Sequence, residues 1–151
     1  MGKLEPWYVT GFCDGEAAFT YSRNGGTFAI YFGVKQKEDS KQIIDDIWGY
    51  FGYVGNIYRD KGALPRKNSG FTKPSVYYRV TKIDELKIIV DHFDKYPIQS
   101  DKKRSAYNIW RDMVMHKLTH YRSSDYDILR KLAAELSSVN SQSRAFKVHT
   151  K

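Results

Sequence analysis

The chain has 151 residues, which is enough for one domain with a hydrophobic core. Its 25 Lys and Arg residues against 17 Asp and Glu residues give a formal net charge of +8, which favours a polyanionic partner, most simply nucleic acid. A single cysteine, no secretory signal and no apolar run near about 18 residues argue against secreted, disulfide-stabilised and membrane proteins. We therefore expect a soluble, intracellular chain whose compartment, organelle or prokaryotic cytoplasm, stays open.

The first predicted element is a helix that begins near Pro6, a residue suited to a first helical turn. Glycines four apart on one stripe of this helix would let a second helix approach closely. A kink, a C-cap or tight packing within one core is the alternative explanation. The single cysteine, Cys13, is expected to be buried here. The stripe repeats at i, i+3, i+4 and i+7 and consists of Tyr8, Gly11, Phe12 and Gly15.

A β-hairpin is predicted directly after this helix. Residues 17–23 alternate, Asn24-Gly25-Gly26 is a strong turn signal, and residues 27–37 alternate again. One face of the return strand must point towards the core, because its even positions are all apolar. These positions are Phe28, Ile30, Phe32 and Val34.

The later pattern predicts two more strands and four more helices. A basic loop over residues 61–74 separates the two strands. In chain order we expect a helix from Asp39 or Ser40, either of which could cap it, to Phe51, a strand over 53–60, a strand over 75–80, a helix over 84–93, a helix from Ser100 or Asp101 through Leu118, and a helix over 125–139.

The predicted order is α-β-β-α-β-β-α-α-α, an α+β fold in one domain over residues 1–140 with a polar tail at 141–151. No internal repeat is visible, so each chain carries one copy of the first helix.

The string Trp-x-Val-Thr-Gly-Phe-x-Asp-Gly-Glu-x-x-Phe, which begins at Trp7, resembles the signature of the LAGLIDADG homing endonucleases. Residues 9–17 stand on the motif positions. Thr10 replaces the usual alanine, and Ala17 stands where glycine is common. The predicted element order is also similar to the fold of that family, an αββαββα core with a four-stranded antiparallel saddle lying in the DNA major groove.

The resemblance implies a site-specific DNA endonuclease that uses divalent metal, Mg²⁺ or Mn²⁺, with Ca²⁺ as a non-productive substitute. It assigns metal binding to Glu16, and the backbone oxygen of Gly15 lies next to this acid. Since phosphodiester hydrolysis on both strands needs one acid for each, a closed homodimer through the glycine stripe is the simplest arrangement. Asp14 is interpreted instead as a structural cap.

Two accessory sites follow from the same resemblance. Gln36 matches a glutamine that orders active-site water, although alternation points it towards the core unless a bulge or strand end redirects it. A buried, hydrogen-bonded glutamine is the alternative. Lys102 is the first choice for a lysine that stabilises phosphate or water, and Lys103 is the close second. A solvated helix start is the alternative for both lysines.

DNA contacts are expected from the polar face of the sheet and from the basic loop. A ribbon of about eight residues at roughly 3.3 Å each spans about 26 Å, or about eight base pairs, so a dimer should need a long pseudopalindromic site. The expected DNA-binding residues are Ser22, Asn24, Thr27, Tyr31, Lys35, Lys37, Asn56, Tyr58, Asp60, Ser75, Tyr77 and Arg79 on the sheet, Lys61, Arg66, Lys67 and Lys73 in the loop, and Lys103.

His116 and His120 lie four apart on a predicted helix, but no third ligand is evident, so zinc is not expected. The leading hypothesis is a homodimeric, Mg²⁺-dependent endonuclease of double-stranded DNA, with no membrane or small-molecule partner. Its rivals are an RNA-binding intron maturase, a DNA-binding protein without catalysis, and half of a two-motif protein.

Overall fold

The structure, a computed structural model, describes residues 4–24, 27–62, 73–120 and 125–140. Its elements follow the predicted order, and none of the helices it describes is long and apolar enough to cross a bilayer. They are α1 (Pro6–Glu16), β1 (Ala17–Asn24), β2 (Thr27–Lys37), the 3-10 helix η1 (Glu38–Ser40), α2 (Lys41–Tyr50), β3 (Asn56–Asp60), β4 (Ser75–Val80), α3 (Ile83–Lys95), α4 (Asp101–Thr119) and α5 (Tyr126–Asn140).

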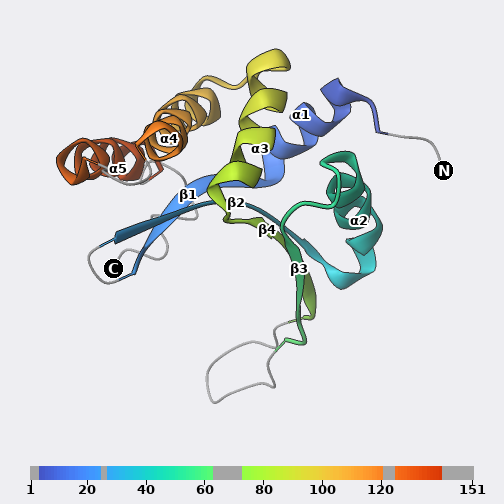
Figure 1. The fold of residues 1–151 in the computed structure, drawn as a ribbon. Coiled ribbons are helices and arrows are strands. Elements are labelled where there is room, and N and C mark those ends of the chain that lie inside the picture. The colour runs from blue at the N-terminus through green and yellow to red at the C-terminus, as the bar shows by residue number, and fades with distance from the viewer. Residues whose placement is uncertain (1–3, 25–26, 63–72, 121–124, 141–151) are drawn as a thin grey trace.

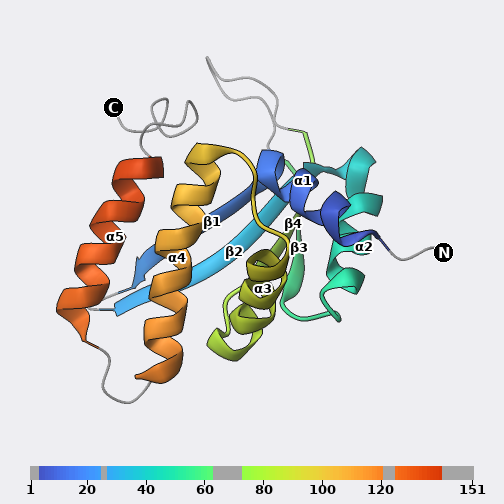
Figure 2. The ribbon, with the colours of Figure 1, turned by 90° about the horizontal axis from the view of Figure 1, so that it is seen from above.

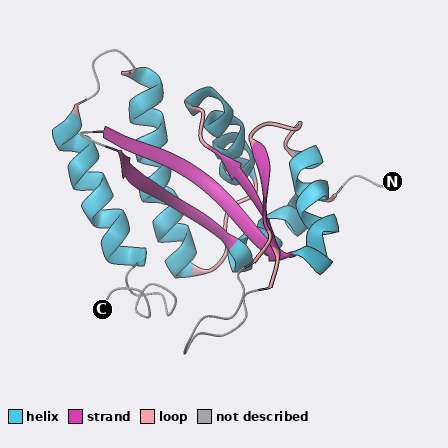
Figure 3. Cartoon of the chain, turned by 90° about the horizontal axis from the view of Figure 1, so that it is seen from below, coloured by secondary structure: helices cyan, strands magenta, loops and turns pink. Residues whose placement is uncertain are grey.

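The strands form one curved sheet in the order β1-β2-β4-β3, and every neighbouring pair is antiparallel. Figure 1 shows the described helices together on one side of this sheet, and Figure 2 shows α3, α4 and α5 lying across it. Seen from below, the strands lie in front of the helices and their other face is open (Figure 3). The predicted α+β class with a four-stranded antiparallel saddle is confirmed.

The covered face of the sheet forms one wall of the hydrophobic core. Phe28, Ile30, Phe32 and Val34 are all buried, as the alternation in β2 predicts. Trp110 of α4 is fully buried beside Phe19 of β1, and its indole Nε1–H donates a 3.0 Å hydrogen bond to the carbonyl oxygen of Tyr31. This bond ties the α4 layer to the central part of the sheet.

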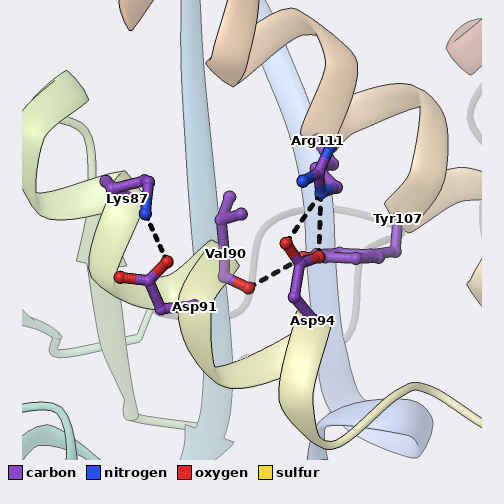
Figure 4. Close-up of polar contacts among 6 residues, drawn as sticks. All are labelled: Lys87, Val90, Asp91, Asp94, Tyr107 and Arg111. Carbon is purple, nitrogen blue, oxygen red and sulfur yellow. Dashed lines mark hydrogen bonds and ion pairs between the residues drawn. The ribbon is translucent and has the colours of Figure 1, made fainter.

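Polar contacts hold α3 against α4 beside this core (Figure 4). Asp94 accepts hydrogen bonds from Arg111 Nε, at 2.8 and 2.9 Å, and from the hydroxyl of Tyr107, at 2.8 Å. Burial raises the pKa of Asp94, but the bonds from Arg111 and Tyr107 outweigh it and the net pKa is lowered. The carboxylate therefore stays charged and fixes the distance between the two helices.

The sequence-based boundaries fail at two places. The predicted strand at 53–60 begins only at Asn56, because Gly52, Tyr53 and Gly55 all have positive φ and form a turn. The helix predicted from residue 39 or 40 is split into η1 and α2. Ser40 occupies the N-cap position of α2 but makes no capping bond, since its hydroxyl contacts the carboxylate of Asp39 instead.

Candidate functional site

The C-terminal end of α1 delivers an exposed carboxylate to the surface. Glu16 is the last residue of α1, and Ala17 starts β1 without a connecting loop. The carbonyl groups of a last helical turn have no amide further along the helix, and this end carries a partial negative charge. The position therefore suits a cation.

Glu16 lies on the rim of a hollow of about 720 Å³. The hollow wraps around the end of β2 and the start of β4, so its wall carries one acid and several cationic or amide groups. A phosphate and a cation could both be bound there. The lining residues are Glu16, Lys35, Gln36, Lys37, Ser40, Lys73 and Ser75.

Gln36 lies in the wall of the same hollow as Glu16 and is half-buried. It pairs in register with Val76, so no bulge redirects it. Its side-chain amide donates a 3.0 Å hydrogen bond to the carbonyl oxygen of Lys35. The nearby end of β2 is what opens this core-facing position to the hollow.

Asp14 caps a helix that starts far along the chain. Its carboxylate accepts hydrogen bonds from the backbone N–H of Gln99, at 3.2 Å, of Ser100, at 3.0 Å, and from the Ser100 hydroxyl. Burial raises the pKa of Asp14, but these bonds and the charge of Lys103 outweigh it and the net pKa is lowered. The structural interpretation of Asp14 agrees with these contacts.

The structure places Lys103 rather than Lys102 at the end of α1. The ammonium group of Lys103 donates to the carbonyl oxygen of Ala17, the residue after Glu16. Burial lowers the pKa of Lys103, whereas the charges of Asp14 and Glu16 oppose that shift. Lys102 is exposed at the start of α4. The sequence could not separate these neighbours, because the choice depends on the rotation of α4 about its axis.

The pairing register puts every predicted polar position of the sheet on one face. Lys35 pairs with Tyr77, and Tyr77 pairs with Tyr58, so the row crosses β2, β4 and β3. Ser75 shares this face by register, where it pairs with Lys37, but it is only 5% exposed and not open to solvent as predicted. The side chains of Asn24 and Thr27, and the whole of Arg66 and Lys67, lie outside the part of the chain that the structure describes.

The glycine stripe of α1 faces away from the core. Trp7 and Tyr8 are 53% and 51% exposed, Gly11 and Gly15 are exposed, and Phe12 is half-buried. A Cβ built on Gly11 or on Gly15 meets no described atom within 4 Å. Packing against the described residues therefore does not explain either glycine.

The opposite side of α1 is fixed by a buried hydrogen-bond chain that the sequence did not reveal. The hydroxyl of Thr10 donates to the carbonyl oxygen of Tyr96, at 2.7 Å, so it accepts from His92 Nε2, at 2.9 Å. Nδ1 of His92 then accepts from the hydroxyl of Tyr50, at 3.0 Å. Burial lowers the pKa of His92 to about 4, so the ring is neutral and this tautomer is defined.

His116 and His120 stack at 4.6 Å between ring centroids. Nε2 of His116 accepts a 3.0 Å hydrogen bond from the backbone N–H of Asp125, next to the start of α5. Within the described residues no group of three or more His, Cys, Asp or Glu side chains is arranged to hold a metal ion. The contact indicates that His116 connects α4 to α5.

The family profile described as LAGLIDADG endonuclease matches residues 9–114, which include most of the motif helix α1, the whole sheet and most of α4. The chain belongs to the LAGLIDADG endonuclease family. The match covers more than half of the chain, and its single motif helix is α1.

Solved structures of LAGLIDADG proteins share this fold. The meganuclease I-AabMI bound to uncleaved DNA is 26% identical, with a TM-score of 0.72, and the alignment covers 96% of this chain and 48% of that one. I-SmaMI bound to uncleavable DNA is 24% identical, with a TM-score of 0.73, over 99% of this chain and 49% of that one. The homing endonuclease I-TnaI is 23% identical, with a TM-score of 0.70, over 95% and 93%.

Among curated proteins, the chain is 27% identical over 124 residues to an uncharacterized 50.9 kDa protein in ND4 intron 1 of Podospora anserina. The alignment covers 76% of this LAGLIDADG chain and 25% of the relative. The chain thus spans a quarter of the length of this relative and about half of I-AabMI, whereas it matches nearly the full length of I-TnaI.

Proposed function

We propose that this chain is a homodimeric, site-specific endonuclease of double-stranded DNA that depends on a divalent metal ion. The observation that carries the proposal is the arrangement of α1. Gly11 and Gly15 face open space on one side of this helix, and Glu16 stands exposed at its end. Two such helices packed side by side about a twofold axis would bring two acids to one place, one for each DNA strand.

The composition of α1 supports a partner on this surface. Glycine within a helix costs about 1 kcal/mol relative to alanine, and no described atom lies within 4 Å of a Cβ built at Gly11. Trp7 and Tyr8 leave large apolar side chains exposed on the same helix. A second copy of α1 would cover these rings and use the space at the glycines.

Glu16 and the carbonyl oxygen of Gly15 would hold the metal. One carboxylate, one carbonyl and the oxygens of a bound phosphate suit Mg²⁺, which needs few protein ligands. When bound, Mg²⁺ or Mn²⁺ polarises the phosphate and lowers the pKa of water. Calcium is expected to bind without supporting cleavage, and I-SmaMI has been solved bound to uncleaved DNA target in the presence of calcium ions.

Lys103 at the end of α1 and Gln36 in the wall of the hollow would position the substrate. Lys103 carries its positive charge beside the end of α1, where it can stabilise charge that develops on a phosphate. Gln36 can orient a water molecule from the wall that it shares with Glu16. Lys102 is less suited to this role, because it is exposed at the helix start.

The open face of the sheet would lie in the DNA major groove. The inner strand β2 has 11 residues, which at roughly 3.3 Å each span about 36 Å, or about eleven base pairs. I-AabMI and I-SmaMI, which are 26% and 24% identical to this chain, have both been solved with DNA. A dimer should therefore recognise a long, pseudopalindromic site.

A cleavage assay tests the proposal. The purified full chain is incubated with a randomised DNA library in Mg²⁺, in Ca²⁺ and in EDTA, and cut sites are sequenced. Cutting of one symmetric site in Mg²⁺ alone is expected. Glu16→Gln should abolish cutting and leave binding within a few-fold, whereas Glu135→Gln, on the exposed side of α5, should cut normally. Normal cutting by Glu16→Gln would overturn the assignment of the active site.

The second candidate is an RNA-binding intron maturase on the same fold. The observation that favours it is the curated relative, which is described as lying in an intron. Specific binding of intron RNA together with no DNA cleavage would support it. Sedimentation of the free chain at micromolar concentration separates a homodimer from half of a two-motif protein.

A further inference from the structure

The guanidinium group of Arg79 lies between two tyrosine rings on the open face of the sheet. Its Cζ is 4.4 Å from the ring centroid of Tyr31 and 5.5 Å from that of Tyr77. Lys35 Nζ is 5.1 Å from the same Tyr77 ring. The rings come from β2 and β4, so two central strands hold this side chain in place.

The strand register explains how the rings reach Arg79. Arg79 pairs with Gly33 in the neighbouring strand β2 and with Asn56 in the neighbouring strand β3. A Cβ placed at Gly33 would lie 3.8 Å from Cε2 of Tyr31, so this ring leans over the glycine towards β4. The missing side chain at position 33 therefore leaves the surface open for the contact between Tyr31 and Arg79.

Arg79 also lacks the partners that most other described arginines have. Arg59, Arg104, Arg111 and Arg130 each form an ion pair with a carboxylate. Among the residues described, no carboxylate pairs with Arg79, and its buried Nε has no hydrogen-bond partner. With no described carboxylate beside it, the half-buried guanidinium of Arg79 would be stabilised by a ligand that brings acceptors to its accessible N–H groups.

We propose that Arg79 is a specificity-determining residue that reads guanine in the major groove. This inference rests on the proposed function. Guanine presents O6 and N7 side by side, and a planar guanidinium can donate to both. Arg79 lies on the inner strand β4, between β2 and β3, so it would face base edges rather than the flanking phosphates of DNA bound against the sheet. Stacking between Tyr31 and Tyr77 holds the planar group ready, so less side-chain freedom is lost on binding.

Selection from a randomised duplex library tests the inference, using the full chain in Ca²⁺ so that bound DNA is recovered uncut. The wild type should show one strongly guanine-preferring position in each half-site. Arg79→Gln should lose this preference by about five- to a hundred-fold and shift it towards adenine, because glutamine pairs with adenine N6 and N7. Arg59→Gln removes the same charge from the other face of β3 and should leave every base preference unchanged.

Two further variants test whether the rings of Tyr31 and Tyr77 hold Arg79 in place, and they control for misfolding. Tyr31→Leu keeps an apolar side chain but removes one ring, and should weaken the guanine preference at that position alone. Arg79→Lys keeps the charge without the planar fork, and should bind DNA with that preference reduced. Thermal unfolding should show both variants folded like the wild type.

The outcomes separate this inference from the proposed function. If the wild type selects no sequence, the proposed function fails and the inference fails with it. If the wild type selects a site and Arg79→Gln weakens binding equally for all bases, Arg79 contacts phosphate. In that case the guanine assignment is overturned while the endonuclease proposal stands. Loss of the guanine preference at one position in Arg79→Gln, with a reduced preference at the same position in Arg79→Lys, confirms the assignment.

Discussion

Thr10 of the motif helix and His92 of α3 are joined by a buried hydrogen bond of 2.9 Å between Oγ1 and Nε2. Both side chains are nearly inaccessible, with Thr10 at 1% and His92 at 7% exposure. The hydroxyl of Tyr50 extends the chain to α2 through Nδ1 of His92. Three helices therefore share one polar network, which fixes how α1 sits on the core and where its end delivers Glu16.

The free energy of unfolding should fall as the pH is lowered, because His92 is buried as a neutral ring. Its pKa is lowered from 6.5 to about 4 by burial, so the unfolded state binds the proton first as the pH falls. The contribution of neutral His92 to the free energy of unfolding is fully present above pH 6.5, the pKa of the unfolded state, and is lost between about pH 6.5 and 4. At pH 5 the loss relative to pH 7 should be about 2 kcal/mol.

Urea unfolding of the full chain at pH 7 and pH 5 measures this effect. His92→Gln keeps groups that can donate and accept hydrogen bonds but does not titrate, so its pH dependence in this window should be much smaller. Equal dependence in the wild type and in His92→Gln would show that another group is responsible.

Replacing Asp14 should weaken the start of α4. Asp14→Ala removes the acceptor for the N–H groups of Gln99 and Ser100, and should lower the free energy of unfolding by about 1–2 kcal/mol. Asp14→Asn retains one oxygen acceptor and should cost less. Chemical denaturation of both variants makes the comparison. A loss for Asp14→Ala no greater than for Asp45→Ala, which removes an exposed acid from α2, would rule out the cap.

A large side chain at Gly11 should separate the proposed dimer without unfolding the chain. A Cβ at this position meets no described atom within 4 Å, and leucine favours helix over glycine by about 0.5–1 kcal/mol. Gly11→Leu should therefore sediment as a monomer with an unchanged or higher unfolding midpoint. Ser105→Leu, at an exposed position of α4, serves as the control and should remain dimeric. A dimeric Gly11→Leu would exclude this interface.

The turn between α2 and β3 offers a matched pair of glycines. Gly55 has φ of +77° and Gly52 has φ of +76°, so alanine is strained at both. Only at Gly55 does a Cβ collide with other atoms, at 2.5 Å from the carbonyl oxygen of Arg79. Gly55→Ala should cost more than about 2 kcal/mol, whereas Gly52→Ala should cost about 1 kcal/mol. Thermal unfolding of the two variants should rank them in this order, and equal losses would contradict the clash.

Elements whose signal is local could be predicted from the sequence. The period-two pattern of β2 predicted which of its side chains are buried and placed Tyr31 and Lys35 on the other face. The pattern of β4 did the same for Tyr77 and Arg79, and the register of the two strands puts both pairs on one face of the sheet. The motif string determined where α1 ends and which acid it exposes. Turn boundaries were less predictable, since a positive φ at Tyr53 carries no sequence signal.

What the tertiary structure decided depends on contacts between distant residues. Asp14 binds the N-cap residue of α4, Ser100, which lies 86 residues later, and Thr10 pairs with a histidine 82 residues away. Lys103 rather than Lys102 reaches the end of α1, because adjacent residues on a helix point about 100° apart and only packing sets the rotation. Local patterns determine faces and periods, whereas the meeting of side chains from separate elements requires the folded backbone.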